Sequence, residues 1–149
     1  MIAGRVCAQP VVPDRMQFAN IKLKISEGAQ KEIQKDVDAL TKSPTYFEAM
    51  VERVRMYFPI IERILEEEEV SDNFKYLVIQ ESALVSDAVS VSDAVGYWQF
   101  KEMTAVEMGL RVDQYIDERM NIVSSTHAAA KYFKKNNFYF NNWLYALQA

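Results

Sequence analysis

Glu81 stands in an apolar stretch of the sequence, YLVIQESALV. A carboxyl group among apolar side chains is disfavoured as an anion, so its pKa is expected to rise above the usual value. A carboxylic acid that stays protonated near neutral pH is what a general acid requires, for example in the cleavage of glycosidic bonds. A structural glutamate that is exposed or hydrogen-bonded is the competing interpretation, because many helices carry one such residue.

Two more carboxyl groups follow in the tandem repeat VSDAVS–VSDAVG, residues 85–96, with Asp87 in the first copy and Asp93 in the second. Ordinary glycosidases use two carboxyl groups, about 5–5.5 Å apart for retention and farther apart for inversion. Either aspartate could therefore be the partner of Glu81. Ser-Asp pairs also hydrogen-bond nearby backbone, so turn formation is the alternative. The repeat itself could be a strand pair or the spacer between two halves of a site.

Composition limits the classes of function. The chain has 149 residues, half of them apolar, which suits one domain with its own core. The net charge is -4 and the basic residues are not clustered, so nucleic acid is not an expected partner. No apolar run approaches the ~20 residues of a membrane-spanning helix, so no transmembrane segment is expected. With Cys7 and His127 as the sole cysteine and histidine, neither an intrachain disulfide nor a metal site is expected, and no cofactor is predicted.

The elements that must position these side chains are mostly helical. Residues 1–16 predict an irregular tail, and whether residues 1–10 are the remnant of an export signal stays open. Residues 18–25 alternate as in a short strand. Pro59 should end or kink one helix and open the next. The expected helices lie at about residues 29–40, 44–58, 60–69, 73–84, 101–108, 117–137 and from 140 onward.

Several separated motifs resemble one family. Glu81-Ser82, Ser90, Gly-Tyr-Trp-Gln-Phe at 96–100 and Asp-Glu-Arg at 117–119 occur in the order found in lytic transglycosylases of goose-type lysozyme-like fold, the SLT domain. Upstream, YFPIIERIL and DNFKYL resemble the lead-in of the membrane-bound lytic transglycosylase D group. The resemblance covers roughly residues 18–149. Glu-Ser alone would carry no weight, but the ordered combination is specific.

The resemblance implies a mostly α fold of α+β, lysozyme-like type. It would be a single catalytic helical domain with a small strand element. Residues 1–42 would form an N-terminal tail and helical extension, and residues 43–149 the transglycosylase domain. Family members continue after LYALQA with a segment whose tyrosine lines the site. The domain is therefore expected to be truncated at its C-terminus, which leaves the activity of this chain open.

The implied function is that of an enzyme, a murein lyase. It would cleave the β-1,4 bond between N-acetylmuramic acid and N-acetylglucosamine in peptidoglycan glycan strands without water, leaving 1,6-anhydromuramoyl ends. Glu81 matches the family's single catalytic glutamate, which acts first as acid and then as base. The implied location is the periplasm or cell envelope, with outer-membrane association left open. The alternatives are a non-catalytic peptidoglycan-binding or scaffold domain, and a hydrolytic muramidase using Asp87 or Asp93.

Further positions are expected to bind substrate. Gln99 matches the family's substrate-contacting glutamine, whose amide offers donors and an acceptor together. Ser90 matches a serine that lies where hydrolytic relatives hold a carboxylate. Gly96 would permit close backbone approach beside the cleft, and Tyr97 is ambiguous between core and site. Lys101 stands where the family commonly has methionine, and its cation could contact the acidic stem peptide or point to solvent.

Other conspicuous side chains are expected to be structural. Trp98 should turn inward behind Gln99. An ion-pair cluster is expected at residues 117–119, with the Arg119 guanidinium beside the carboxylates of Asp117 and Glu118. The later aromatic residues are expected to be mostly core, with Tyr139 exposed; they are Tyr132, Phe133, Phe138, Phe140, Trp143 and Tyr145.

Overall fold

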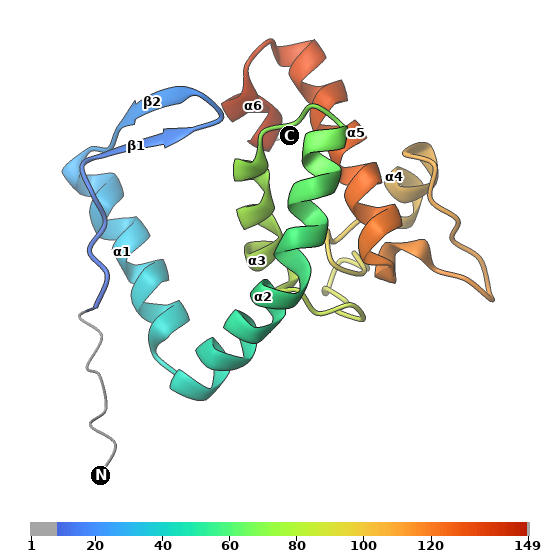
Figure 1. Ribbon diagram of the computed structural model, residues 1–149, viewed down its shortest axis with the longest axis horizontal. Coiled ribbons are helices and arrows are strands. Elements are labelled where there is room, and N and C mark those ends of the chain that lie inside the picture. The colour runs from blue at the N-terminus through green and yellow to red at the C-terminus, as the bar shows by residue number, and fades with distance from the viewer. Residues whose placement is uncertain (1–8, 149) are drawn as a thin grey trace. The chain divides into compact units, whose positions relative to one another are not determined.

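The computed structural model describes residues 9–148 (Figure 1). Cys7 and most of the segment 1–10, with its open question of an export signal, lie outside the described residues. The chain divides into two compact units, Met1–Ala49 and Met50–Ala149. The sequence-based boundary between residues 42 and 43 stays a prediction.

The first unit contains a β-hairpin and a helix. Strands β1 (Arg15–Phe18) and β2 (Ile21–Lys24) pair antiparallel, with Phe18 opposite Ile21. The two connecting residues, Ala19 and Asn20, both have positive φ, 44° and 67°, as the twist of a two-residue hairpin requires. The single strand expected at residues 18–25 is therefore wrong, because the chain reverses after Phe18. Helix α1 (Glu27–Thr41) follows, and Ser26 Oγ accepts a hydrogen bond from its third residue, Ala29.

Helix α2 (Pro44–Glu67) is continuous through Pro59. It begins as expected, with the Ser43 Oγ accepting a hydrogen bond from the Tyr46 N–H. The expectation that one helix ends at Pro59 and the next begins there is wrong, and the alternative of a kink stays a prediction. Proline removes one backbone hydrogen bond, but the neighbouring side chains Phe58 and Ile61 are buried. Burying one such apolar side chain stabilises the folded state by about 1.5–3 kcal/mol, which is enough to offset the lost backbone hydrogen bond.

The second unit is mostly helical. After α2 the described elements are the 3-10 turn η1 (Asp72–Tyr76), α3 (Leu77–Ser82), α4 (Glu102–Glu107), η2 (Glu118–Met120), α5 (Ile122–Phe140) and α6 (Trp143–Gln148). A long loop joins α3 to α4, drawn in yellow in Figure 1. Helix α6 packs on α5, and η2 packs on the same helix. The mostly α, lysozyme-like class expected from the sequence is confirmed.

Aromatic rings form the centre of this unit. Phe74 lies against Phe133 and Trp143, with ring centroids 4.6 and 5.4 Å apart. Trp98 packs edge-on against Phe133 at 5.8 Å, and its indole N–H donates to Thr126 Oγ1 at 3.0 Å. Trp98 is only 7% exposed. The prediction that it faces inward is confirmed.

The expectation of a mostly buried C-terminal aromatic cluster is wrong for three of its members. Phe138 is 83% exposed, and Phe140 and Tyr145 are also exposed. Tyr139 is exposed as expected. Successive residues on a helix point about 100° apart, so Phe138, Tyr139 and Phe140 cannot all face one core.

Candidate active site

Glu81 lies in the last turn of α3, just before the chain changes direction. Ala83 and Leu84 both have positive φ, 49° and 62°. The Ala83 N–H donates to the Ile79 carbonyl, which closes the helix. The Ala83 carbonyl in turn accepts a hydrogen bond from Arg53 Nε at 2.8 Å. Helix α2 therefore holds the end of the helix that carries Glu81.

A cleft of about 390 Å³ opens in front of Glu81. Its lining comes from α3, from residues 96–100, which we call the motif loop, from Lys101 directly after this loop, and from α4, α5 and α6. The lining residues are Leu77, Glu81, Trp98, Gln99, Phe100, Lys101, Thr104, Ala129, Tyr132, Phe133, Ala146 and Leu147. Within the described part of the chain, Glu81 is the single carboxyl group of this lining and Lys101 the single cation.

The surroundings of Glu81 change its acidity. Its side chain is exposed along the cleft, but the protein atoms around it displace enough water to disfavour the anion. Burial therefore raises the pKa of the Glu81 carboxyl above its ordinary value of 4.5. The direction is the one expected from the apolar sequence around it. A carboxyl with a raised pKa at a cleft wall is suited to giving and taking a proton.

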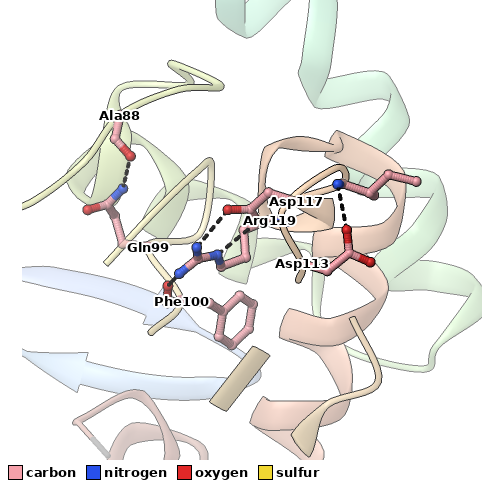
Figure 2. Close-up of polar contacts among 7 residues, drawn as sticks. Ala88, Gln99, Phe100, Asp113, Asp117 and Arg119 are labelled. Carbon is pink, nitrogen blue, oxygen red and sulfur yellow. Dashed lines mark hydrogen bonds and ion pairs between the residues drawn. The ribbon is translucent and has the colours of Figure 1, made fainter. Parts of the chain in front are cut away.

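Gln99 lines the same cleft as Glu81, from a tightly hydrogen-bonded loop. Its φ is 51°, and its Nε2 donates to the carbonyls of Gly96 at 2.8 Å and Ala88 at 3.1 Å. Figure 2 shows the bond to Ala88. With both amide hydrogens directed at the backbone, Oε1 is the group that the side chain can still offer as an acceptor.

Gly96 allows this loop to lie close to the backbone of η2. Its φ is 85°, and a Cβ at this position would lie 2.0 Å from the carbonyl oxygen of Arg119. No real side chain tolerates such a contact, so the motif loop can lie against η2 only with glycine here. The close approach expected of Gly96 is therefore made to the protein's own backbone.

Arg119 fixes the same loop through its guanidinium (Figure 2). Its guanidinium binds both oxygens of Asp117, at 2.8 and 2.6 Å, and donates to the Phe100 carbonyl at 3.2 Å. The Arg119 hydrogen bonds hold the pKa of Asp117 below its usual range. The expected ion-pair cluster is wrong for Glu118, whose carboxylate instead accepts a hydrogen bond from the Arg111 N–H at 2.6 Å.

The two copies of the tandem repeat pair with each other. Val89 of the first copy forms an antiparallel bridge with Val95, its equivalent in the second. Ser90 Oγ accepts hydrogen bonds from the N–H groups of Ser92 and Ala94 at 3.3 and 3.1 Å. Ser90 thus closes the turn between the copies.

The structure brings together only part of the predicted site. Glu81, Gln99 and Lys101 line the cleft, whereas Ser90, Gly96 and Tyr97 are outside its lining. Tyr97 is 4% exposed, with its ring edge-on to Tyr57 at 5.3 Å. Burial, together with a hydrogen bond to Tyr57, raises the pKa of the Tyr97 phenol above its ordinary value.

The aspartates of the repeat lie elsewhere. Asp87 and Asp93 are exposed, and neither is part of the cleft lining. In the segment that the structure describes, no group of three or more His, Cys, Asp or Glu side chains is arranged to hold a metal ion.

Comparison with known proteins adds an independent finding. Residues 58–149, more than half of the chain, match the family model described as the transglycosylase SLT domain. The chain belongs to the SLT family. The resemblance recognised in the sequence is thereby confirmed.

Two curated relatives support the same assignment for this SLT chain. They are the proteins named membrane-bound lytic murein transglycosylase D in Escherichia coli strain K12 and in Escherichia coli O6:H1 strain CFT073. Each is 26% identical over 137 residues, which is 91% of this chain and 30% of the relative. The chain therefore spans less than a third of the length of these relatives.

Ser82 is a contact of the SLT site that sequence reasoning did not assign. Its Oγ donates to the Tyr97 carbonyl at 2.8 Å, which ties the end of α3 to the motif loop. The bond joins the residue next to Glu81 to the loop that carries Gln99. Its place in the Glu-Ser pair was the available indication, but the partner is a backbone carbonyl that only the fold brings near.

Replacing Ser82 by alanine is expected to lower the free energy of unfolding by about 1–2 kcal/mol, because the Tyr97 carbonyl loses a half-buried donor. Urea unfolding would measure the effect. Ser92→Ala, on the exposed turn, is the matched control. Equal stability of the two variants would contradict the assignment.

Proposed function

We propose that this chain carries the active site of a peptidoglycan lytic transglycosylase. It would cleave the β-1,4 bond between N-acetylmuramic acid and N-acetylglucosamine and leave a 1,6-anhydromuramoyl end. Membership of the SLT family and the printed names of the two relatives support the class of reaction. The observation that carries the mechanism is that Glu81, with its raised pKa, is the single carboxyl group lining the cleft in the described residues.

In the first step Glu81 acts as a general acid. Its proton passes to the glycosidic oxygen as the bond between that oxygen and the anomeric carbon of the muramoyl residue breaks. A carboxyl whose anion is disfavoured by burial keeps this proton at a higher pH than an ordinary glutamate. The positive charge left at the sugar is shielded by the substrate's own 2-acetamido group.

In the second step the Glu81 carboxylate acts as a base. It takes the proton of the muramoyl C6 hydroxyl while that oxygen bonds to the anomeric carbon, which closes the anhydro ring. The net change is transfer of one proton from the C6 oxygen to the leaving oxygen, and Glu81 ends protonated as it began. The reaction consumes no water and needs no second carboxylate, which agrees with the exposed positions of Asp87 and Asp93 outside the cleft lining.

The remaining predicted site residues take two kinds of role in this proposal. Gln99 would contact the sugar directly, with its Oε1 accepting from a hydroxyl group. Ser90, Gly96 and Tyr97 would act on substrate binding through the shape of the loop, because their described contacts are made to the protein itself. We further propose a cell-envelope location, where the substrate lies. No helix in the described part of the chain has the length and apolar character needed to cross a membrane.

The reaction can be tested by digesting purified glycan strands in water enriched in oxygen-18. The expected product carries a 1,6-anhydro end without the heavy isotope, since no water enters the bond. Reducing muramic ends labelled with oxygen-18 would instead show a hydrolase. Strand binding without any product would favour a non-catalytic peptidoglycan-binding domain. Mass spectrometry of the released muropeptides distinguishes all three results.

A further inference from the structure

Lys101 is a feature of the cleft that the cleavage chemistry leaves unused. It follows the motif loop directly, its side chain is exposed, and it lines the cleft with Gln99 and Thr104. In the described residues it is the one cation of that lining. The chain as a whole carries a net charge of -4, so a free positive charge at this place is not part of a general basic surface.

The carboxylates nearest to Lys101 in sequence do not pair with it. Glu107 pairs with Lys135, and the charge of Glu102 contributes to the electrostatic environment of Arg119. Glu81 and Lys101 form no ion pair with each other in the part of the chain that the structure describes. Among residues 9–148 no ion pair is formed by Lys101.

We propose that Lys101 binds a carboxylate carried by the muramoyl residue of the substrate, and thereby makes the cleft selective for peptidoglycan over uncharged glycans. The inference rests on the proposed function, which supplies the substrate. Sugar rings and acetamido groups are neutral, so the carboxylates of a peptidoglycan strand belong to its muramoyl substituents. Two sources share this chemistry, namely the lactyl group of a peptide-free strand and the stem peptide of a substituted one.

Equilibrium binding separates these possibilities without requiring turnover. Three fluorescent ligands are compared: a chitin oligosaccharide, which has no carboxylate, a peptide-free glycan strand, and a peptide-bearing strand. The Glu81→Gln background keeps the ligands intact. Lys101→Met is expected to weaken binding of one or both carboxylate-bearing strands by roughly three- to fivefold, the range of a solvent-exposed ion pair. Chitin binding should not change.

Two matched variants and a change of salt concentration serve as controls for the binding experiment. Lys101→Arg keeps the charge and should bind like the parent. Lys131→Met removes another exposed lysine that lies outside the cleft lining and should also bind like the parent. Raising the salt concentration should weaken the carboxylate-dependent part of binding in the parent but not in Lys101→Met.

Each outcome decides the inference. Loss on the peptide-bearing strand alone assigns the stem peptide, and loss on both strands includes the lactyl group. Equal loss on all three ligands, no loss on any, or no binding of any ligand would overturn it. The proposed function is read separately, from anhydro products of the chain with Glu81 intact. A failure of that reaction is therefore distinguishable from a failure of carboxylate recognition.

Discussion

Glu81→Gln is expected to reduce the release of 1,6-anhydro muropeptides by about 10²- to 10⁴-fold, the range of a lost general acid–base group. Glutamine keeps the size and hydrogen-bonding shape of the side chain but can neither give nor take the proton. Binding of glycan strands should persist, so the loss should appear in kcat. Quantified muropeptide release under single-turnover conditions measures it directly.

Asp87→Asn and Asp93→Asn provide the matched controls. Both aspartates are exposed and outside the cleft lining, so each amide variant should release anhydro product at the parent rate. Substantial activity in Glu81→Gln, or its loss in either aspartate variant, would contradict the single-carboxylate mechanism.

The raised pKa of Glu81 adds a pH dependence with a defined sign. Because the reaction starts from the protonated acid, kcat/KM should fall as the pH rises through the Glu81 pKa, which lies above the ordinary 4.5. Stability follows the same direction. The folded state holds this proton more tightly than the unfolded state, so the contribution is fully present below pH 4.5 and is lost as the pH rises through the folded pKa. Glu81→Gln should therefore gain Tm relative to the parent at neutral pH, and the gain should shrink in acid.

Gly96→Ala is expected to destabilise the second unit by about 3–5 kcal/mol, the sum of a strained backbone and an overpacked contact. The added Cβ would lie 2.0 Å from the Arg119 carbonyl oxygen and 2.5 Å from its carbon, both rigid backbone atoms. For a domain of this size the loss corresponds to a fall in Tm of roughly 15 °C or more. Thermal unfolding followed by circular dichroism measures it.

Gly109→Ala separates the two causes. Gly109 also has a positive φ, 96°, but the atom nearest to its added Cβ would be the flexible end of Lys131, 3.9 Å away. Only conformational strain is expected, about 1–2 kcal/mol. If both alanine variants lost the same amount of stability, the contact between Gly96 and the Arg119 backbone would not be the cause.

The helices could be predicted because their causes are local. Ser26 and Ser43 each accept a hydrogen bond from the third residue beyond them, which their position before an apolar period already indicated. The hairpin was missed because Ala19-Asn20 lacks the glycine that marks most tight turns. The continuity of α2 through Pro59 depends on burial of Phe58 and Ile61, which is decided by packing with residues distant in sequence.

In the candidate site, too, local features could be predicted, whereas contacts between distant residues could not. The apolar neighbours of Glu81 were sufficient to predict a raised pKa, and Glu81 and Gln99 both line the cleft. The bonds that fix the motif loop could not be predicted. Ser82, Gln99 and Arg119 all donate to backbone carbonyls, and which carbonyl lies within reach depends on the path of an irregular loop.

The paired repeat has an exposed tip and a hydrogen-bonded base. The tip is closed by its own bonds, with the Ser90 N–H donating to the Ala94 carbonyl at 2.9 Å, and Val91 at its apex is fully exposed. The base is the Ala88 carbonyl, which accepts from the Gly96 N–H and from Gln99 Nε2. Since doubling the length of a loop costs only about 0.6 kcal/mol, a peptide tag or a folded binding module can be inserted at Val91 while the base keeps Gln99 in place. The apex is thus a position where the protein can be labelled without changing the hydrogen bonds that hold Gln99.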